Sequence, residues 1–225
     1  MHIDNLIIEV TRKCNMSCDH CLRGDAENVN IDSHLFKHFI KRNRIDSVGC
    51  LSITGGEPFL NPNAIIRIAH VIYEQDVDLF GFFMATNGTV FDYSLIKPLA
   101  MFREKVDEDE MFFLEISKDD FHDDKPIHPI WKLIKHGIRT VEEKSVIAEG
   151  RGIDINPEGR TVRDGEWTWE NGDIVEGNVY INALGMICKE CDFSYESQKY
   201  RNIGHCLDRK LIEMEDNDYD DSEDI

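Results

Sequence analysis

The amino-acid sequence predicts an α/β fold in which parallel strands alternate with helices. Short β-rich runs alternate with stretches of helical apolar spacing over the first two thirds of the chain. Such alternation calls for crossover helices between parallel strands, which produces an open sheet or a barrel. Hydrophobic residues make up 41% of the 225 residues, which is enough to bury a sizeable core.

The first expected elements are two strands with a helix between them. Residues 6–11 and 48–54 are the strands, and residues 35–41 are the helix. The Gly-Gly-Glu-Pro turn at 55–58 follows the second strand directly. Residues 63–74 then predict a helix, because their apolar residues recur at the spacing of one helix face.

The later elements repeat this alternation. Residues 79–86 predict a third strand that ends at the turn pair Asn87-Gly88, and residues 93–102 predict a helix interrupted by Pro98. The remaining expected elements are strands at 111–117, 145–149 and 179–183 and a helix at 130–141. In such a fold, functional groups gather at the carboxyl ends of the strands.

The pattern divides the chain into three parts. Residues 1–155 form the expected core, and 156–212 are expected to complete the barrel and to carry a second cysteine group. The stretch 156–176 is rich in Gly, Trp and charge, which favours turns or a hairpin. Residues 213–225 contain eight acidic residues and no basic ones, so we expect a disordered acidic tail.

The charge balance excludes several classes of partner. The 44 acidic and 25 basic residues give a formal net charge of −19, which disfavours nucleic acid and anionic membranes. The chain has no apolar run of about 18 residues and no signal-peptide profile, so a cytoplasmic protein is expected. In that reducing compartment, the 7 cysteines are interpreted as metal ligands or plain thiols.

Three cysteines form the most specific motif in the chain. Cys14, Cys18 and Cys21 lie directly after the first expected strand, in the spacing C-x3-C-x2-C. Three thiolates on one short loop suit a four-iron cluster that keeps one iron open to another ligand. The alternatives are a zinc site completed by His20 or a distant residue, and a coincidental cluster of thiols.

This spacing, together with the Gly-Gly-Glu-Pro turn, resembles the radical SAM superfamily. The resemblance implies a partial (β/α)6 barrel with a [4Fe-4S] cluster and S-adenosyl-L-methionine as cofactors. Gly55 and Gly56 would allow close backbone approach to the cofactor, and the Glu57 carboxylate would accept from its ammonium group.

Further residues match the superfamily less specifically. By resemblance, Ser117 and Asp119 would lie near the ribose of the bound cofactor, and His20 stands where an aromatic residue contacts the adenine. Asn87 would reach the cofactor or would serve only in a turn. The segment 149–152 stands where the family often has a glycine-rich stretch.

A second cysteine group has the spacing C-x2-C-x14-C. Cys188, Cys191 and Cys206 resemble a cluster loop of the molybdenum-cofactor cyclase, with flanks similar to the Twitch and SPASM extensions. The alternatives are zinc, with His205 or Cys50 as the fourth ligand, and inert thiols. Cys50 itself is expected in the core.

The resemblance also implies the activity. An electron from the reduced cluster would cleave S-adenosylmethionine, and the resulting 5′-deoxyadenosyl radical would abstract hydrogen from a peptide or protein substrate. Flavodoxin or ferredoxin would supply the electron. A nucleotide or other small molecule is the alternative substrate, and a non-catalytic zinc or iron–sulfur binding module is the alternative class of protein.

Overall fold

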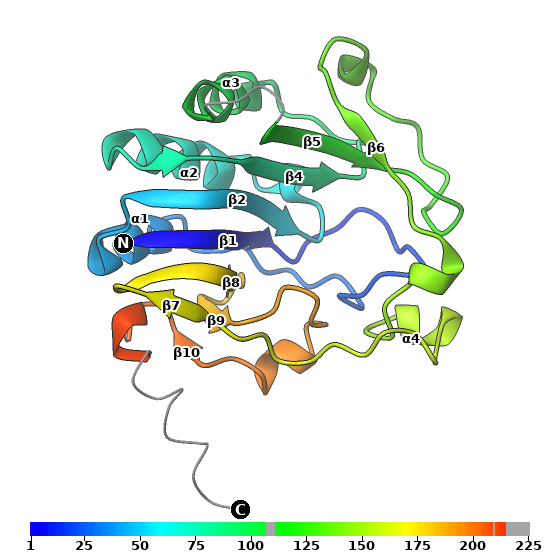
Figure 1. The fold of residues 1–225 in the computed structure, drawn as a ribbon. Helices are drawn as coiled ribbons and strands as arrows, with labels where there is room; N and C mark the ends of the chain where they lie inside the picture. Colours follow the sequence, from blue (N-terminus) through cyan, green and yellow to red (C-terminus); the bar gives the residue numbers. More distant parts are fainter. Residues whose placement is uncertain (107–110, 209, 215–225) are drawn as a thin grey trace, which may run out of the picture.

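The computed structural model of the protein describes residues 1–106, 111–208 and 210–214. In these residues, ten strands form one sheet in the order β10-β9-β8-β1-β2-β4-β5-β6, with β3 beside β2 and β7 beside β8 (Figure 1). The strands are β1 (His2–Thr11), β2 (Ser47–Gly55), β3 (Asp78–Leu79), β4 (Phe82–Thr86), β5 (Phe112–Ser117), β6 (Gly137–Arg139), β7 (Thr168–Glu170), β8 (Asp173–Ile181), β9 (Met186–Cys188) and β10 (Gly204–His205).

The sheet is mixed and is not closed into a barrel. Strands β8, β1, β2, β4, β5 and β6 run parallel to one another, whereas β7 and β9 pair antiparallel with β8 and β10 pairs antiparallel with β9. The α-helices are α1 (Leu35–Asn43), α2 (Pro62–Glu74), α3 (Ile96–Lys105) and α4 (Gly152–Ile155). Figure 1 shows α1, α2 and α3 together along one side of the sheet. This architecture confirms the α/β class and the partial barrel.

The two faces of the central sheet differ. On β1, Leu6, Ile8 and Val10 are fully buried in the main core, together with Phe39 of α1 and Ile65 of α2. The residues between them point to the other side, because side chains alternate along a strand. We call that side the open face; on β1 and β2 it carries the partly exposed side chains of Asn5, Cys50, Ser52 and Thr54.

Cys50 therefore differs from its expected place in the core. Its thiol lies 3.9 Å from the Ser52 hydroxyl on the open face. Its strand neighbour Leu51 takes the buried position, since successive residues face opposite sides.

Two other element predictions are wrong. Residues 130–141 do not form a helix: the short turn η4 (Pro129–Lys132) is followed by β6, where Ile138 pairs with Ile116 of β5. Gly137 weakens a helix at this point, and pairing at the sheet edge overrides the apolar spacing. Residues 145–149 do not form a strand either: the stretch begins in the turn η5 (Glu143–Ser145), and the described sheet ends at β6.

Other predictions agree with the structure or differ in detail. The strand expected at 79–86 is split into β3 and β4, and the helix expected at 93–102 begins as the turn η2 (Tyr93–Leu95) before α3. The stretch 156–176 contributes β7 to a hairpin with β8. None of the described helices is long and apolar enough to cross a membrane.

The C-terminal part joins the same sheet. Strand β8 pairs parallel with β1, so residues beyond 155 extend the sheet at the edge opposite β6. The chain then forms η6 (Ser197–Lys199) and η7 (Leu211–Met214), and Met214 is buried. The domain boundaries remain a prediction, and the acidic tail beyond residue 214 lies outside the described residues.

Candidate cofactor-binding site

The three-cysteine loop leaves the carboxyl end of β1, as the fold class requires. The Cys21 N–H donates to the Cys18 carbonyl at 3.2 Å, which turns the loop back on itself. The thiols of Cys14 and Cys21 are close enough to act electrostatically on Cys18. The three Sγ atoms do not all lie within 4.8 Å of one another, whereas a tetrahedral zinc ion with ~2.3 Å bonds holds its sulfurs about 3.8 Å apart.

The chemistry of this donor set fits an iron–sulfur cluster. A cluster binds each thiolate through a different iron, so its ligands stand wider apart than those of one zinc ion. Burial raises the pKa of Cys14, and it raises the pKa of Cys18 to about 11 with a further contribution from the neighbouring thiols. Metal binding must displace these protons, which couples cluster assembly to pH.

The Gly-Gly-Glu-Pro turn holds the start of this loop. The Gly56 N–H donates to the Thr11 carbonyl and the Glu57 N–H to the Lys13 carbonyl, both at 2.8 Å. A Cβ atom on Gly56 would lie 2.4 Å from the Lys13 carbonyl oxygen, and one on Gly55 equally close to that of Thr11. Both glycines are thus required by the chain's own backbone, apart from any approach to a ligand.

The Glu57 side chain points into the protein, which differs from its expected role. It is 1% exposed and accepts hydrogen bonds from the N–H of Phe59 (3.1 Å), the hydroxyl of Thr86 (2.8 Å) and the N–H of Asn87 (2.7 Å). Burial raises its pKa to about 7 despite these donors. The carboxylate therefore ties the turn after β2 to the end of β4.

Asn87 connects that strand end to the cysteine loop. Its side-chain Nδ2 donates to the Asn15 side chain at 2.8 Å. Its side-chain Oδ1 accepts from the N–H and the hydroxyl of Thr89. Asn15 in turn donates to the Thr89 hydroxyl at 2.7 Å. The neighbouring Gly88 has a positive φ of 71°, so the predicted turn is present as well.

Ser117 and Asp119 lie at the carboxyl end of β5. The Asp119 carboxylate is 2.7 Å from His122 Nδ1 and 3.8 Å from His20 Nε2. Burial opposes its ionisation, but the hydrogen bond and charge of His122 outweigh this and lower the pKa of Asp119. The structure thus brings Asp119 and His20 together and adds His122, which follows Asp119 by three residues and was not among the predicted residues.

The second cysteine group is not brought together as one site. Cys188 is packed with Tyr180 and Phe193 in a small cluster that Cys191 also contacts, whereas Cys206 is buried in the main core. The Cys206 N–H donates to the Gly185 carbonyl, opposite a position three residues before Cys188. A metal site that uses all three thiols does not fit this arrangement. Burial raises the pKa of Cys188 to about 12 and of Cys206 to about 11.

A buried polar network stands between the two cysteine groups. Glu9 at the end of β1 accepts from Arg12 Nε at 2.9 Å, from the Tyr180 hydroxyl, and from Gln198 at 3.2 Å. Glu9 and Arg12 are 0% and 1% exposed, so each charge depends on the other for compensation. Sequence reasoning missed this network, because its partners are up to 189 residues apart.

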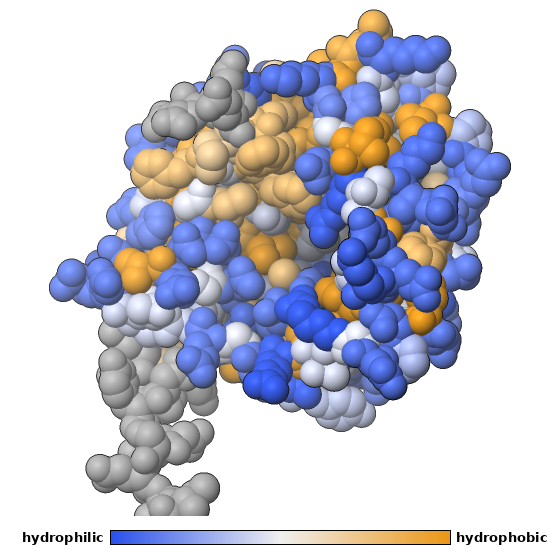
Figure 2. All heavy atoms as spheres, turned by 45° about the vertical axis from the view of Figure 1, so that its right-hand side comes forward, coloured by the Kyte–Doolittle hydropathy of each residue, from blue (hydrophilic) through white to orange (hydrophobic). Residues whose placement is uncertain are grey.

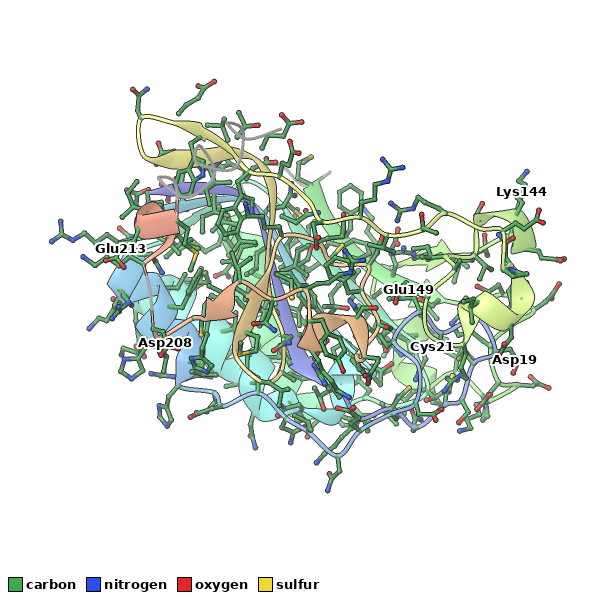
Figure 3. The ribbon with its side chains drawn as sticks, turned by 90° about the horizontal axis from the view of Figure 1, so that it is seen from below. Asp19, Cys21, Lys144, Glu149, Asp208 and Glu213 are labelled. Carbon is green, nitrogen blue, oxygen red and sulfur yellow. The ribbon has the colours of Figure 1, made fainter. Side chains whose placement is uncertain are left out.

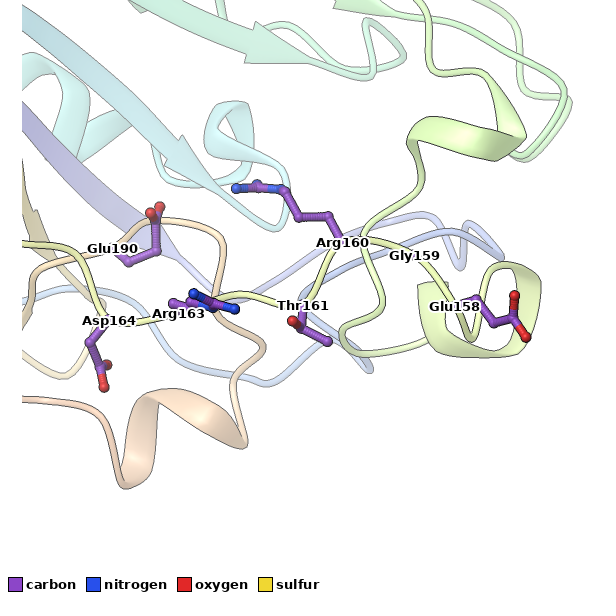
Figure 4. A pocket seen from close by; sticks show the side chains of 7 residues that line it. All are labelled: Glu158, Gly159, Arg160, Thr161, Arg163, Asp164 and Glu190. Carbon is purple, nitrogen blue, oxygen red and sulfur yellow. The ribbon is translucent and has the colours of Figure 1, made fainter.

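A cavity of about 580 Å³ lies outside the predicted site. Its lining residues are Glu158, Gly159, Arg160, Thr161, Arg163, Asp164 and Glu190 (Figure 4). Its lining carries both acidic and basic side chains, and Arg160 already forms an ion pair with Asp192. None of the predicted cofactor residues lines it.

Comparison with known proteins identifies the class to which this fold and site belong. The family model of the radical SAM superfamily matches residues 8–156. The chain belongs to this superfamily, whose members are enzymes that use a [4Fe-4S] cluster and S-adenosylmethionine.

Two curated relatives match parts of the chain. A GTP 3′,8-cyclase of Aliarcobacter butzleri is 34% identical over 93 residues, which is 38% of this chain and 28% of the cyclase. An uncharacterized protein of Methanocaldococcus jannaschii is 35% identical over 65 residues, which is 28% of this chain and 23% of that protein. The chain thus spans about a quarter of the length of each.

Solved structures share the fold over nearly the whole chain. One is anSMEcpe with bound AdoMet and a Kp18Cys peptide, at a TM-score of 0.60 and 12% identity, covering 95% of this chain and 80% of that one. Another is Streptococcus suis SuiB bound to the precursor peptide SuiA, at 0.57 and 11%, covering 93% and 64%. At these identities the likeness concerns the fold alone.

Proposed function

We propose that this chain is a radical SAM enzyme that acts on a peptide or protein. The observation that carries the proposal is the loop of Cys14, Cys18 and Cys21 at the carboxyl end of β1, anchored by Glu57 and Asn87 to the ends of the next two parallel strands. One buried thiol, Cys18, and two half-buried thiols, Cys14 and Cys21, all free of disulfides, suit a cluster with one open iron.

The surrounding residues would hold S-adenosylmethionine against that iron. The backbone at Gly55 and Gly56 adjoins the cysteine loop. Ser117 and Asp119 border the loop from the end of β5, where Asp119 lies 3.8 Å from His20 of the loop itself. When bound, the cluster supplies an electron, and S-adenosylmethionine supplies the radical that takes a hydrogen atom from the substrate. The carboxylate of Asp119, fixed by His122, suits a hydrogen bond from a ribose hydroxyl.

The open face supports a peptide substrate. Phe83 of β4 pairs with Phe113 of β5, and Phe113 is 45% exposed on the same face as Ser117, four residues further along the strand. Figure 2 shows apolar side chains gathered on the upper part of one side of the molecule. An exposed aromatic surface that leads to the cofactor end can bury an apolar peptide side chain.

A nucleotide or another small molecule is the second candidate substrate. The 34% identity to a GTP 3′,8-cyclase favours it, although this match covers only 38% of the chain. In either case, the reaction needs an external one-electron donor, for which flavodoxin or ferredoxin is suitable.

Anaerobic reconstitution tests the proposal. The chain should bind four irons at the three-cysteine loop and release 5′-deoxyadenosine from S-adenosylmethionine under dithionite. A pooled peptide library should stimulate this release more than GTP does. Stoichiometric zinc without iron in the loop would refute the radical chemistry, and stimulation by GTP alone would transfer the proposal to the nucleotide.

A further inference from the structure

The segment Glu149-Gly150-Arg151-Gly152 lies against the three-cysteine loop. Figure 3 shows Glu149 at the same end of the molecule as Cys21 and Asp19, away from Asp208 and Glu213. The Arg151 N–H donates to the Cys21 carbonyl at 2.9 Å, so the two segments are in direct contact.

The Arg151 side chain adds two contacts to that backbone bond. Its Nε donates to the Cys18 carbonyl at 3.0 Å, and its NH1 nitrogen lies 2.8 Å from a carboxylate oxygen of Asp25. Through its backbone and side chain, this one residue therefore binds the carbonyls of two of the three cysteines. The Asp25 side chain is 95% exposed, so the ion pair contributes little and the carbonyl contacts dominate.

The two glycines explain how the segment comes so close. Gly150 has a φ of 54°, and a Cβ atom there would lie 2.4 Å from the Leu22 carbonyl and 2.6 Å from that of Cys21. A Cβ on Gly152 would lie 2.4 Å from the Ile147 carbonyl. The small residues on both sides of Arg151 allow its backbone to reach the loop.

Glu149 binds the segment to residues of the C-terminal part of the chain. Its carboxylate accepts from the Ser194 N–H at 3.1 Å and from the Ser197 hydroxyl at 2.9 Å. Both serines follow Cys191 in the sequence. The N–H of Tyr195, which lies between them, donates to the Arg23 carbonyl. We call the contacts of Arg151 with the Cys18 and Cys21 carbonyls the clamp; Glu149 anchors it to the C-terminal part of the chain.

We propose that Arg151 is a positioning residue for the iron–sulfur cluster: it fixes the carbonyls of Cys18 and Cys21 and places a positive charge beside the cluster. The inference rests on the proposed function, because it assumes that a cluster binds to this loop. A reduced cluster carries one more negative charge than an oxidised one, so a nearby guanidinium raises its reduction potential.

The test compares Arg151→Gln, Arg151→Lys and Arg42→Gln with the wild type. Arg42 is the matched control, because its guanidinium donates to the Asp208 carbonyl at 3.0 Å at the opposite end of the molecule. Two properties are measured: amide hydrogen exchange of residues 14–25 in the iron-free chain, and the reduction potential of the reconstituted cluster by spin-resonance titration.

In both Arg151 variants, the Cys21 and Gly24 amides should exchange about tenfold faster than in the wild type, because the loop loses its side-chain clamp. The potential should become more negative in Arg151→Gln and should largely recover in Arg151→Lys, which keeps the charge. Arg42→Gln should match the wild type in both measurements.

Unchanged exchange in Arg151→Gln, or an unchanged potential in that variant, would overturn the inference. Failure of the proposed function gives a different result, since the wild type itself would then bind no iron. The exchange measurement on the iron-free chain reports on the clamp in either case.

Discussion

The Glu57 carboxylate experiences two opposing effects that can be separated by pH. Burial favours the neutral acid, whereas three donors favour the carboxylate, and the balance leaves its pKa near 7. Since this value lies above the ordinary 4.5, the folded state binds the proton more tightly than the unfolded state. The stability that protonation contributes is therefore complete below about pH 4.5 and is lost as the pH rises through 7.

Replacing Glu57 by Gln should remove this pH dependence. We expect the wild type to exceed Glu57→Gln in unfolding free energy by more at pH 5.5 than at pH 8, with a slope of up to about 1.4 kcal/mol per pH unit. Urea unfolding of both chains across this range measures the difference. A gap that is constant with pH would mean that Glu57 is ionised throughout.

The cysteine ligands lead to a second prediction at the residue scale. Replacing Cys14, Cys18 or Cys21 by Ala should abolish the reconstituted cluster, because three thiolates are the minimum set for a site with one open iron. Replacing Cys50, which lies on the open face, should leave the iron content unchanged. Iron and sulfide analysis after anaerobic reconstitution compares the four variants, and full iron retention in any loop variant would contradict the assignment.

Single residues also show what could be predicted from the sequence. The spacing of the three cysteines and the turn at 55–58 indicated the site, because local motifs carry that information. The direction of the Glu57 side chain could not be predicted, since its partners Thr86 and Asn87 come from another strand. His122 could have been included, because a histidine three residues after Asp119 is visible in the sequence.

Among the elements, the turn after β2 leaves no room for a side chain at Gly56. A Cβ on Gly56 would lie 2.4 Å from a backbone oxygen of the cysteine loop, and backbone cannot give way as a flexible side chain can. Gly56→Ala should therefore displace the loop and lower both stability and iron content. At the control position Gly137, a Cβ meets only the Glu115 side chain at 3.4 Å, so Gly137→Ala should retain its iron. Equal iron content in the two variants would contradict this prediction.

The pairing of the C-terminal strands separates Cys206 from Cys188. The spacing C-x2-C-x14-C predicted one metal site, but Cys188 and Cys206 are packed in different clusters, which spacing alone cannot reveal. The same limit affected residues 130–141, where sheet pairing of Ile138 replaced a helix.

If the second cysteine group binds a metal, only Cys188 and Cys191 should be needed as its ligands. Replacing Cys188 and Cys191 together should remove any metal beyond the first cluster, whereas Cys206→Ala should leave the metal content as in the wild type. Metal analysis of the reconstituted chains distinguishes these outcomes. Loss of metal in Cys206→Ala would mean that the loops rearrange on binding.

For the whole molecule, the last described residue belongs to the stretch that the sequence assigned to the acidic tail. The expected tail began at residue 213, yet Met214 is 6% exposed and packs into the main core through η7. The acidic run was recognised by composition, which does not show that its first residues bury an apolar side chain.

Two truncations test this boundary. Ending the chain after Ile212 removes Met214 and should lower stability by about 1.5–3 kcal/mol, the value of a fully buried side chain of this size. Ending it after Met214 removes seven acidic residues and no basic one, so the net charge changes from −19 to −12 without loss of the described core. That longer chain should melt within a few degrees of the wild type and cleave S-adenosylmethionine equally well. Thermal unfolding and 5′-deoxyadenosine release measure both effects, and a large fall in melting temperature for the longer chain would show that residues beyond 214 contribute to the fold.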